Sequence, residues 1–418
     1  MSQNATLERP AEVAGFADAS ALADAPAPAN ASGLRQRAAA LVPKLRARAA
    51  EAETLRRLPD ESIRDMRDAG LFRLMLPQRV GGYQASLHQF IDVVAEVARG
   101  CGSTGWVLGV VNAHHWLVGL FPQKAQDDVF LVKPDAIISA VIGPRGKATK
   151  VAGGYQLNGF WPFCSGSPAA DWVMLGGEVV GDDGNPVDGA DFLIPVKDIE
   201  IKNDWDVTGL RASGSNSVVC KDVFVPEHRC LSLPQAIGGV SPGGEHHSGS
   251  KLYTSAIVPV LALGIVPAAL GIAEGALESF KQRLPGKVVS YTLGEVQQDM
   301  PATHMQVAMA ATKIATARLI MHNIATLIEQ AAESGQGMAF ADRARARMDC
   351  AYSVRLCLEG TEILYLASGG SGLAVGSPIQ RASRDVHAIN MHGLLVLETN
   401  SEMYGRVVLG LPQNTPLI

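Results

Sequence analysis

The chain holds a few side chains whose types suit acid–base and hydrogen-bonding chemistry. An imidazole titrates near neutrality and can both donate and accept hydrogen bonds, and a serine hydroxyl can also do both. The candidates are His114, Ser165 and His392, and a further histidine, His387, stands five residues before His392. The last two histidines follow a glycine-rich run and an Arg-Asp pair. Together these groups suit a reaction that moves a proton or stabilises a reactive oxygen atom.

Each candidate also has an ordinary structural interpretation. A histidine in an apolar helix is more often a hydrogen-bonded core residue or a capping cation, and a Ser-Gly pair alone makes a turn between strands. Trp116 stands at helical spacing from Leu120, which is typical of a core residue. His115 lies about a third of a helical turn from His114 and is expected to face elsewhere. The residue types alone leave both interpretations open.

A metal centre is the competing explanation for the C-terminal histidines. Asp385, His387 and His392 have the composition of a two-histidine, one-carboxylate iron site. On one helix, however, residues five apart diverge by about 140°, so the two imidazoles do not readily converge on one ion. The sequence therefore predicts no metal site, and Arg384 and Asp385 are expected to make a structural ion pair or cap.

The spacing of apolar residues divides the chain into regions of different secondary structure. From residue 34 to about 134 the spacing is helical, and helices are expected at 87–99, 103–120 and 123–131. Short β-branched and aromatic runs then alternate with turn residues and predict strands at 137–142, 147–157, 172–179, 191–196 and 217–225. The helical period returns after a Gly-, Ser- and His-rich stretch, at about 255–283, 296–334, 338–368 and 377–409.

This order predicts an α+β fold with an N-terminal helical domain, a central antiparallel β-domain and a C-terminal four-helix bundle. The expected divisions are a poorly ordered leader at 1–33, the helical domain at 34–135, the β-domain at 136–235, a linker at 236–254 and the bundle at 255–418.

Composition disfavours several classes of function and location. The 418 residues carry a net charge of −5 with no cluster of Lys and Arg, so we expect no nucleic-acid binding. The six cysteines are scattered without a Cys-x-x-Cys pair, which favours a reduced, cytoplasmic compartment, and the N-terminus does not resemble a secretory signal. Residues 255–273 are uncharged and apolar, but Pro259, Pro267 and the amphipathic continuation from Glu274 favour a buried helix over a membrane span.

The order of elements and four local motifs resemble the acyl-CoA dehydrogenase superfamily from about Leu41 to Leu411. The motifs are Ala69 to Phe72 with Leu76-Pro77 and Gly81-Gly82, Asn158 to Gly166 with Asp171-Trp172, Asp222 to Pro226, and Gly369 to Asp385. In most of that superfamily a glutamate base follows the Arg-Asp pair. This chain has Met391-His392-Gly393-Leu394 in its place, so the usual base that removes a substrate α-proton is missing.

Three details resemble the oxygenase components of two-component flavin-dependent monooxygenases, a group that includes the p-hydroxyphenylacetate 3-hydroxylases. They are His114-His115-Trp116, Phe163-Cys164-Ser165-Gly166, and His387 with His392 before a tail from Gly405 to Pro412. The resemblance implies that a separate NAD(P)H:flavin reductase supplies reduced FMN or FAD. It also implies reaction with O2 through a flavin C4a-hydroperoxide and hydroxylation of a phenol-like or indole-like ring. The lack of a Gly-x-Gly-x-x-Gly sequence after a strand agrees with flavin reduction elsewhere.

The same resemblance implies roles for individual residues. Ser165 would place its hydroxyl near flavin N5, and His392 would hydrogen-bond the peroxide or assist deprotonation of a phenol-like substrate. His114 would bind the substrate hydroxyl, and Trp116 would wall the substrate pocket. The implied cofactor-binding residues are Phe163, Ser165, Gly166, Arg283, Lys287, Tyr291, Thr292, Gly369 and Gly370.

The flavin phosphate is expected to contact the loop with Arg283 and Lys287, where Val289 replaces an arginine of close relatives. The glycine-rich turn would supply backbone N–H groups from a neighbouring subunit, and the resemblance implies a homotetramer. Two alternatives stay open. One is an acyl-CoA dehydrogenase-type flavin desaturase whose base comes from elsewhere, and the other is a catalytically silent binding or assembly module.

Overall fold

Helices open the described part of the chain, which covers residues 33–181, 183–247 and 249–418 of the computed structural model. Nearly all of the expected leader at 1–33 lies outside these residues. The N-terminal helices are α1 (Leu34–Leu55), α2 (Asp60–Asp68), α3 (Leu87–Gly100), α4 (Gly102–Val118) and α5 (Gln123–Phe130). The three helices expected between 87 and 131 are thus present, with ends shifted by two residues at most.

The strands that follow form a seven-stranded sheet within the described residues. They are β1 (Ile138–Val151), β2 (Gly154–Cys164), β3 (Trp172–Val180), β4 (Pro186–Pro195), β5 (Glu200–Ile201), β6 (Asn216–Pro226) and β7 (Cys230–Ser232), in the order β5-β6-β2-β1-β3-β4-β7. Neighbouring strands are antiparallel, except that β1 and β3 run parallel. The single strand expected at 147–157 is wrong: Gly153, with φ of +80°, turns the chain into a hairpin between β1 and β2.

Trp161 is the bulkiest fully buried side chain of the apolar core within the sheet. Its ring is fully buried, and its Nε1 donates to Gly176 O at 2.7 Å. A Cβ atom at Gly146 would lie 2.1 Å from the ring, so glycine is required where β1 passes the indole. This packing holds β1 against β2 and leaves Ile138, at the start of β1, in the core shared with the helices.

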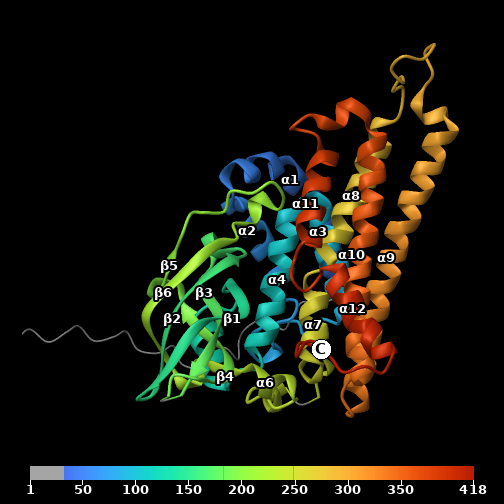
Figure 1. The fold of residues 1–418 in the computed structure, drawn as a ribbon. Helices are drawn as coiled ribbons and strands as arrows, with labels where there is room; N and C mark the ends of the chain where they lie inside the picture. The colour runs from blue at the N-terminus through green and yellow to red at the C-terminus, as the bar shows by residue number, and fades with distance from the viewer. Residues whose placement is uncertain (1–32, 182, 248) are drawn as a thin grey trace, which may run out of the picture.

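Four helices form the C-terminal bundle, namely α8 (Pro267–Arg283), α9 (Pro301–Ser334), α10 (Phe340–Ala367) and α11 (Pro378–Asn390) (Figure 1). The shorter helices α6 (Leu233–Ile237) and α7 (Ile257–Gly264) precede it, and α12 (Leu397–Val408) follows it. The single helical stretch expected at 377–409 is therefore wrong. Asn400 Nδ2 donates to Leu394 O and Val396 O, which stabilises a turn between α11 and α12. That turn places His392 beyond the end of α11.

The segment Ile257–Arg283 is long and apolar enough to cross a membrane by length and composition, with a mean hydropathy of 2.1 in its most apolar window. In this fold 89% of that window is buried inside the protein. The chain bends before Pro267, where α7 ends and α8 begins. The segment is a core element, as the sequence predicts.

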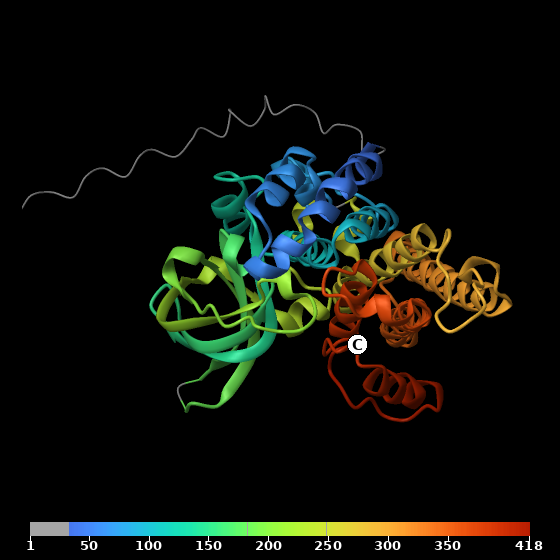
Figure 2. The same cartoon turned by 90° about the horizontal axis from the view of Figure 1, so that it is seen from above.

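Helix α4 lies between the sheet and the bundle. Viewed from above, the sheet and the bundle stand on opposite sides of the N-terminal helices (Figure 2). α4 contacts β1, α7 and α8, and each of its residues is buried. It can therefore present side chains to any space that the sheet and the bundle enclose.

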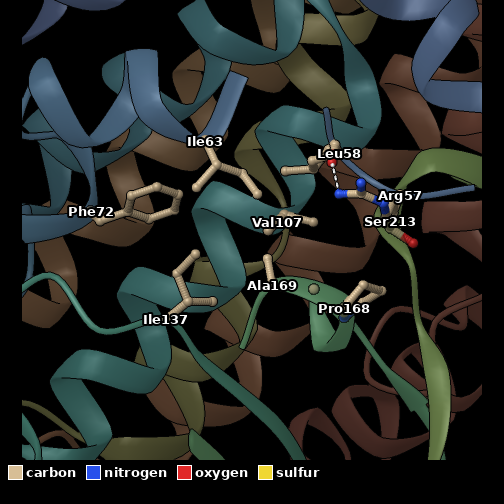
Figure 3. A pocket seen from close by; sticks show the side chains of 10 residues that line it. Arg57, Leu58, Ile63, Phe72, Val107, Ile137, Pro168, Ala169 and Ser213 are labelled. Atoms are coloured by element: carbon tan, nitrogen blue, oxygen red, sulfur yellow. Dashed lines mark hydrogen bonds between the residues drawn. The ribbon is translucent and has the colours of Figure 1, made fainter. Parts of the chain in front are cut away.

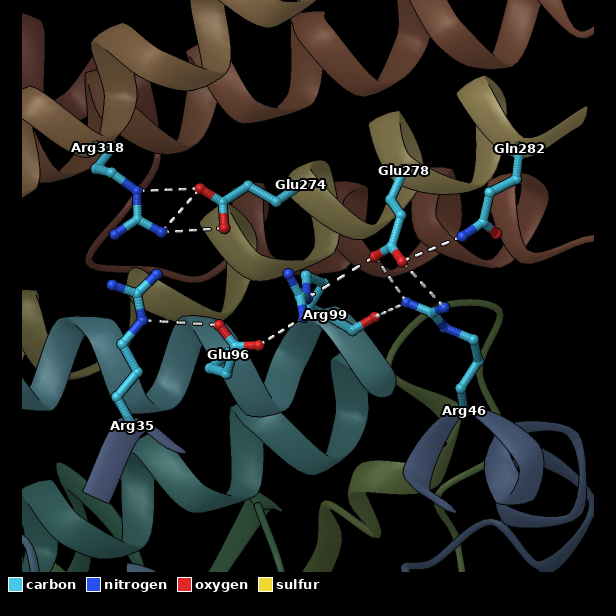
Figure 4. Close-up of polar contacts among 8 residues, drawn as sticks. All are labelled: Arg35, Arg46, Glu96, Arg99, Glu274, Glu278, Gln282 and Arg318. Atoms are coloured by element: carbon cyan, nitrogen blue, oxygen red, sulfur yellow. Dashed lines mark hydrogen bonds and ion pairs between the residues drawn. The ribbon is translucent and has the colours of Figure 1, made fainter. Parts of the chain in front are cut away.

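Partly buried ion pairs join the helices of the bundle to one another and to the N-terminal helices (Figure 4). Arg318 of α9 makes a forked contact with Glu274 of α8, with N–O distances of 2.8 and 3.0 Å. Arg46 of α1 contacts Glu278 of α8 at 2.9 Å. Charge-assisted pairs with this geometry are stronger than neutral hydrogen bonds and help to position α8 between α1 and α9.

Asp191 of β4 is a fully buried carboxyl group, and neither of its side-chain oxygens has a hydrogen-bond partner among the described residues. Burial raises its pKa from the ordinary 3.8 to about 8. Between these values the folded protein keeps a proton that the unfolded chain has released. The contribution of this carboxyl group to the free energy of unfolding is therefore fully present below about pH 4 and is lost as the pH rises to about 8.

We expect Asp191→Asn to abolish the loss of stability with rising pH at this site, because an amide does not ionise. The melting temperature of the variant relative to the parent should rise steadily between pH 4 and pH 8, which corresponds to on the order of 3–5 kcal/mol. Thermal unfolding across that range measures the difference. Asp188→Asn, on the same strand but less buried, is the matched control. A constant difference between Asp191→Asn and the parent would contradict the assignment.

Candidate active site

A cavity of about 860 Å³ lies between the sheet, α4 and the turn after α11. Its volume is in the upper part of the range of small-molecule sites. The charged and titratable residues described in its lining are two arginines and three histidines, with no aspartate or glutamate; they are Arg145, Arg384, His114, His387 and His392. A mostly apolar cavity with this set of groups favours an electron-rich or anionic aromatic ligand over a cationic one.

One face of α4 forms a wall of the cavity. Trp106, Val110 and His114 line it at four-residue spacing, which places them on the same side of a helix. His114 Nδ1 lies 2.7 Å from Ile138 O. A carbonyl oxygen can only accept, so Nδ1 carries the proton and Nε2 is left as an acceptor. Burial lowers the pKa of His114 to about 4, and the ring is therefore neutral at pH 7.

The two residues that follow His114 do not line the cavity. His115 contacts Phe72 O and Ala136 O, each at 2.7 Å, as a core residue. Trp116 is fully buried, its Nε1 donates to Leu252 O at 2.7 Å, and it is not among the lining residues. The structure thus does not bring Trp116 to the cavity. Trp106, which the sequence did not single out, supplies an indole there instead, and its four-residue spacing from Val110 and His114 was the available signal.

Ser165 lies at the end of β2, where its hydroxyl is part of a buried hydrogen-bonded chain. It accepts a hydrogen bond from Trp106 Nε1 at 3.0 Å and lies 2.8 Å from Ser215 Oγ, which is 2.7 Å from Ser213 Oγ. Gly166 turns the chain after it with φ of +79°, and its N–H donates to Ser213 O at 2.8 Å. The loop thereby holds Ser165 at the cavity wall.

Gly166 itself borders a second, much smaller cavity behind this loop (Figure 3). That space measures about 10 Å³ and is lined mostly by apolar side chains such as Ile63, Phe72 and Val107. It is at the lower limit for a single water molecule and is far too small for a substrate. Gly166 therefore shapes the turn beside the larger cavity without lining it.

Phe163 forms the rim next to Ser165. Its side chain is 64% exposed and packs edge-to-face on Trp205, with 6.0 Å between ring centroids. Its φ of +69° is unusual for a residue with a side chain, and strained backbone of this kind clusters at ligand sites.

His392 lies in the turn after α11, with its ring 5.7 Å from that of Trp106. Leu394 N donates to His392 Nδ1 at 3.3 Å, so the proton of the neutral ring is on Nε2. Burial lowers the pKa of His392 to about 4. The two imidazoles therefore differ in character, because His114 offers an acceptor at Nε2 and His392 offers a donor at Nε2.

The remaining groups of the Arg-Asp helix have structural partners. His387, about half exposed, contacts Ser383 O at 2.8 Å on the cavity rim. Asp385 accepts a hydrogen bond from Leu210 N at 2.7 Å, and Arg384 contacts Glu53 at 2.7 Å. Arg384 and Asp385 thus bind different partners, while both anchor α11. Among the described residues no group of three or more His, Cys, Asp or Glu could hold a metal ion.

The predicted phosphate-binding residues gather at a separate place. Lys287 donates to Ser368 O at 2.8 Å and Arg283 donates to Ser377 Oγ at 3.2 Å, so both lie beside the glycine-rich turn that begins at Gly369. The segment between α8 and α9 that carries Lys287, Tyr291 and Thr292 projects from one end of the bundle (Figure 1). None of Arg283, Lys287, Tyr291, Thr292, Gly369 and Gly370 lines the cavity.

Two family models match the chain. The acyl-CoA dehydrogenase N-terminal domain matches residues 30–133, and the acyl-CoA dehydrogenase C-terminal domain matches residues 263–396. These ranges contain α4 with His114 and the turn with His392, which both line the cavity.

Curated relatives extend the likeness over most of the chain. The oxygenase subunit HsaA of a flavin-dependent monooxygenase from Rhodococcus jostii (strain RHA1) is 38% identical, over 90% of this chain and 98% of its own. The oxygenase component of an FADH(2)-dependent resorcinol hydroxylase from Rhizobium sp. (strain MTP-10005) is 31% identical, over 90% and 93%. The structure of XiaF from Streptomyces sp. in complex with FADH2 and glycerol superposes with a TM-score of 0.87 at 29% identity, over 92% and 97%.

The two cavity imidazoles should show opposite tautomers in solution. In protein labelled with ¹⁵N-histidine, we expect His114 to carry its proton on Nδ1 and His392 on Nε2, with both rings neutral from pH 8 down to about pH 5. Their titration midpoints should lie near 4, because burial disfavours the charged ring. His114→Gln and His392→Gln assign the signals. A midpoint near 6.5, or the same tautomer in both rings, would contradict the geometry.

Proposed function

This chain belongs to the acyl-CoA dehydrogenase superfamily as the oxygenase component of a two-component flavin-dependent aromatic monooxygenase, and we propose on this premise that it hydroxylates a phenol held between His114 and His392. Components of this kind use reduced flavin and O2, with the flavin reduced by a separate protein. The observation that carries the proposal is the cavity, where an acceptor imidazole, a donor imidazole and a buried serine hydroxyl meet without any described carboxylate.

The cavity has the features that a flavin ring requires. Its volume accommodates a tricyclic ring together with an aromatic substrate, and Phe163 and Trp205 offer an aromatic wall. Phe163 and Ser165 would hold the ring, and Gly166 would shape the loop that positions them. The bound reduced flavin supplies the electrons that activate O2.

His114 is proposed to bind the phenol hydroxyl. Its Nε2 is the free acceptor, which suits an O–H donor. Because its pKa of about 4 makes it a weak base, it accepts a hydrogen bond from the phenol and does not hold the proton. That hydrogen bond raises the electron density of the ring, which favours attack on an electrophilic oxygen.

His392 is proposed to act on the oxygen side of the reaction. Its Nε2–H can donate to an oxygen atom as negative charge develops there, which is the kind of preorganised stabilisation that enzymes use most. Val110, Leu261 and Ile265 add apolar side chains to the cavity wall and help to keep water away from the reacting groups.

The flavin phosphate is proposed to bind at a subunit interface. Arg283 and Lys287 lie beside the glycine-rich turn and outside the cavity of their own protomer. The arm between α8 and α9 exposes the apolar side chains of Val288, Tyr291 and Leu293, which suits burial against a second copy. Assembly as a homotetramer would bring this arm and the Gly369–Gly370 turn of one protomer to the flavin of another.

The compartment and partners follow from the same proposal. The reduced flavin comes from an NAD(P)H:flavin reductase. All six cysteines are free, and burial raises the pKa of each thiol above its ordinary value, so they behave as unreactive thiols. Free thiols of this kind suit the cytoplasm, which is the proposed location.

A dehydrogenase is the weaker alternative. Removal of an α-proton beside a thioester needs a carboxylate base, and His392 occupies the turn where the glutamate is expected, while no carboxylate lines the described cavity. A silent binding module is also disfavoured, because strained backbone at Phe163 and two imidazoles that line one cavity are unlike a plain docking surface.

The phenol proposal is tested by the yield of hydroxylated product per reduced FMN oxidised, with a panel of phenols and O2. His114→Phe should lower the yield about tenfold and raise hydrogen peroxide release, since a lost hydrogen bond of this kind costs about 1–2 kcal/mol. His392→Phe should act in the same direction. His304→Phe, outside the cavity on α9, is the control. Unchanged yield in both cavity variants, or bleaching of bound flavin by acyl-CoA, would overturn the proposal.

The phosphate site is tested by comparing FMN with riboflavin, which lacks the phosphate. Combined Arg283→Ala and Lys287→Ala substitution should weaken FMN binding about 10–100-fold and leave riboflavin binding unchanged, because charge-assisted hydrogen bonds would be lost. Lys281→Ala, exposed on the same helix, is the matched control. Equal weakening of both flavins would show that the loop acts on structure alone.

A further inference from the structure

Four buried side chains form a continuous hydrogen-bonded chain at the cavity wall. Trp106 Nε1 donates to Ser165 Oγ at 3.0 Å, Ser165 Oγ lies 2.8 Å from Ser215 Oγ, and Ser215 Oγ lies 2.7 Å from Ser213 Oγ. Each of these residues is at most 7% exposed, and all but Ser213 line the cavity. The family resemblance assigns a role to Ser165 alone, so the other members need their own explanation.

The indole determines what the Ser165 hydroxyl can do. An indole N–H can only donate, so one lone pair of Ser165 Oγ is always occupied by Trp106. The hydroxyl of Ser165 keeps one lone pair and one proton. One of the two can point toward Ser215, and the other then points toward the cavity. Ser165 therefore has two fully bonded states.

The first state turns the Ser165 proton toward the cavity and accepts a hydrogen bond from Ser215. The second state donates the Ser165 proton to Ser215 and turns a lone pair toward the cavity. Ser215 permits both because a hydroxyl can donate or accept. The switch needs only rotation about two C–O bonds and no movement of the backbone.

These two states match the two redox forms of a flavin. N5 of an oxidised flavin has a lone pair and accepts a hydrogen bond, whereas N5 of a reduced flavin carries a proton and donates. We propose that Trp106 and Ser215 are positioning residues that let Ser165 serve as a donor to the oxidised ring and as an acceptor from the reduced ring. This inference rests on the proposed function, since it requires the flavin ring to lie beside Ser165.

Trp106 is well placed to hold the chain rigid. It lies on the fully buried helix α4, where a Cβ atom at Gly105 would be 2.4 Å from that of Ala98, so α3 and α4 pack too closely to shift easily. The same indole lies 5.7 Å from the ring of His392. The indole N–H of Trp106, however, bonds Ser165 and not His392.

Removal of Ser215 should affect the two redox forms unequally. In Ser215→Ala the proton of Ser165 still satisfies an oxidised flavin. With a reduced flavin that proton must turn toward alanine and stay unpaired in a buried site, which is costly. We expect the dissociation constant of reduced FMN to rise about tenfold and that of oxidised FMN to change by less than about twofold. The potential of the bound flavin should then fall by about 30 mV.

Removal of the indole N–H should affect flavin binding only through Ser165. Trp106→Phe should weaken both redox forms about two- to tenfold by freeing the hydroxyl to rotate. In a Ser165→Ala background, neither Trp106→Phe nor Ser215→Ala should change either dissociation constant further. Such a double-mutant cycle separates positioning from a general loss of packing.

Two matched controls are available in the same elements. Ser167→Ala removes a buried hydroxyl from the same loop. This hydroxyl donates to Gly214 O at 3.1 Å and takes no part in the hydrogen bonds that link Trp106 to Ser213. Trp116→Phe removes an indole N–H from the same helix, where it bonds Leu252 O. Both should lower the melting temperature without changing the ratio of the two dissociation constants.

Anaerobic titration of reduced FMN and aerobic titration of oxidised FMN measure every quantity. If the unaltered protein binds neither form, the proposed function fails. If it binds both and Ser215→Ala weakens them equally, or if the Trp106→Phe effect persists without the Ser165 hydroxyl, the inference is overturned while the proposed function stands.

Discussion

The close packing of α4 is the constraint on which the site depends. Gly102, Gly105 and Gly109 bring this helix against Ile272, Ala98 and Gly264, at distances where a Cβ atom would meet a neighbour within 3 Å. The helix is buried over its whole length and touches the sheet on one side and the bundle on the other. In a core packed this closely, a change of one methyl group in side-chain volume alters the packing, so each side chain is held in a single position. Trp106 and His114 inherit that rigidity, and so does any ligand placed by them.

The part of the cavity lining that contains His392 depends on α11 and on the contacts that anchor this helix. Asp385 is buried and accepts from Leu210 N, while Arg384 pairs with Glu53 of α1. Burial raises the pKa of Asp385 to about 7, and the Leu210 N–H favours the charged form against that cost. The helix is thereby tied to α1 and to the loop 207–210 that lines the cavity. His392 in the following turn is positioned by these contacts, although none of them involves its own ring.

Sequence reasoning identified the fold and the residues that meet in the cavity more reliably than it identified their surroundings. Ser165, His114 and His392 come from three distant segments, and their types and local motifs were enough to single them out. Trp106 was missed because a tryptophan on an apolar helix is usually a core residue. Trp116 was predicted to line the pocket instead, although it packs in the core. The break after α11 was missed because it depends on Asn400 of α12, whose side chain donates to two carbonyls of the preceding turn. The parallel pairing of β1 with β3 is likewise a tertiary feature that local alternation cannot predict.

The change of chemistry on this scaffold follows from what each group can carry. A carboxylate in a closed apolar cavity holds a charge or a proton, so it suits abstraction of an α-proton. Burial keeps both imidazoles neutral. In each ring Nδ1 is hydrogen-bonded to the backbone, which leaves Nε2 as an acceptor in His114 and as a donor in His392. A neutral donor and a neutral acceptor can bind an oxygen-containing substrate and stabilise developing charge without bringing a permanent charge into the cavity. Substitution of histidine for the expected glutamate thus removes a carboxylate base and adds a directional hydrogen-bond donor, and the serine hydroxyls beside Trp106 are neutral groups as well.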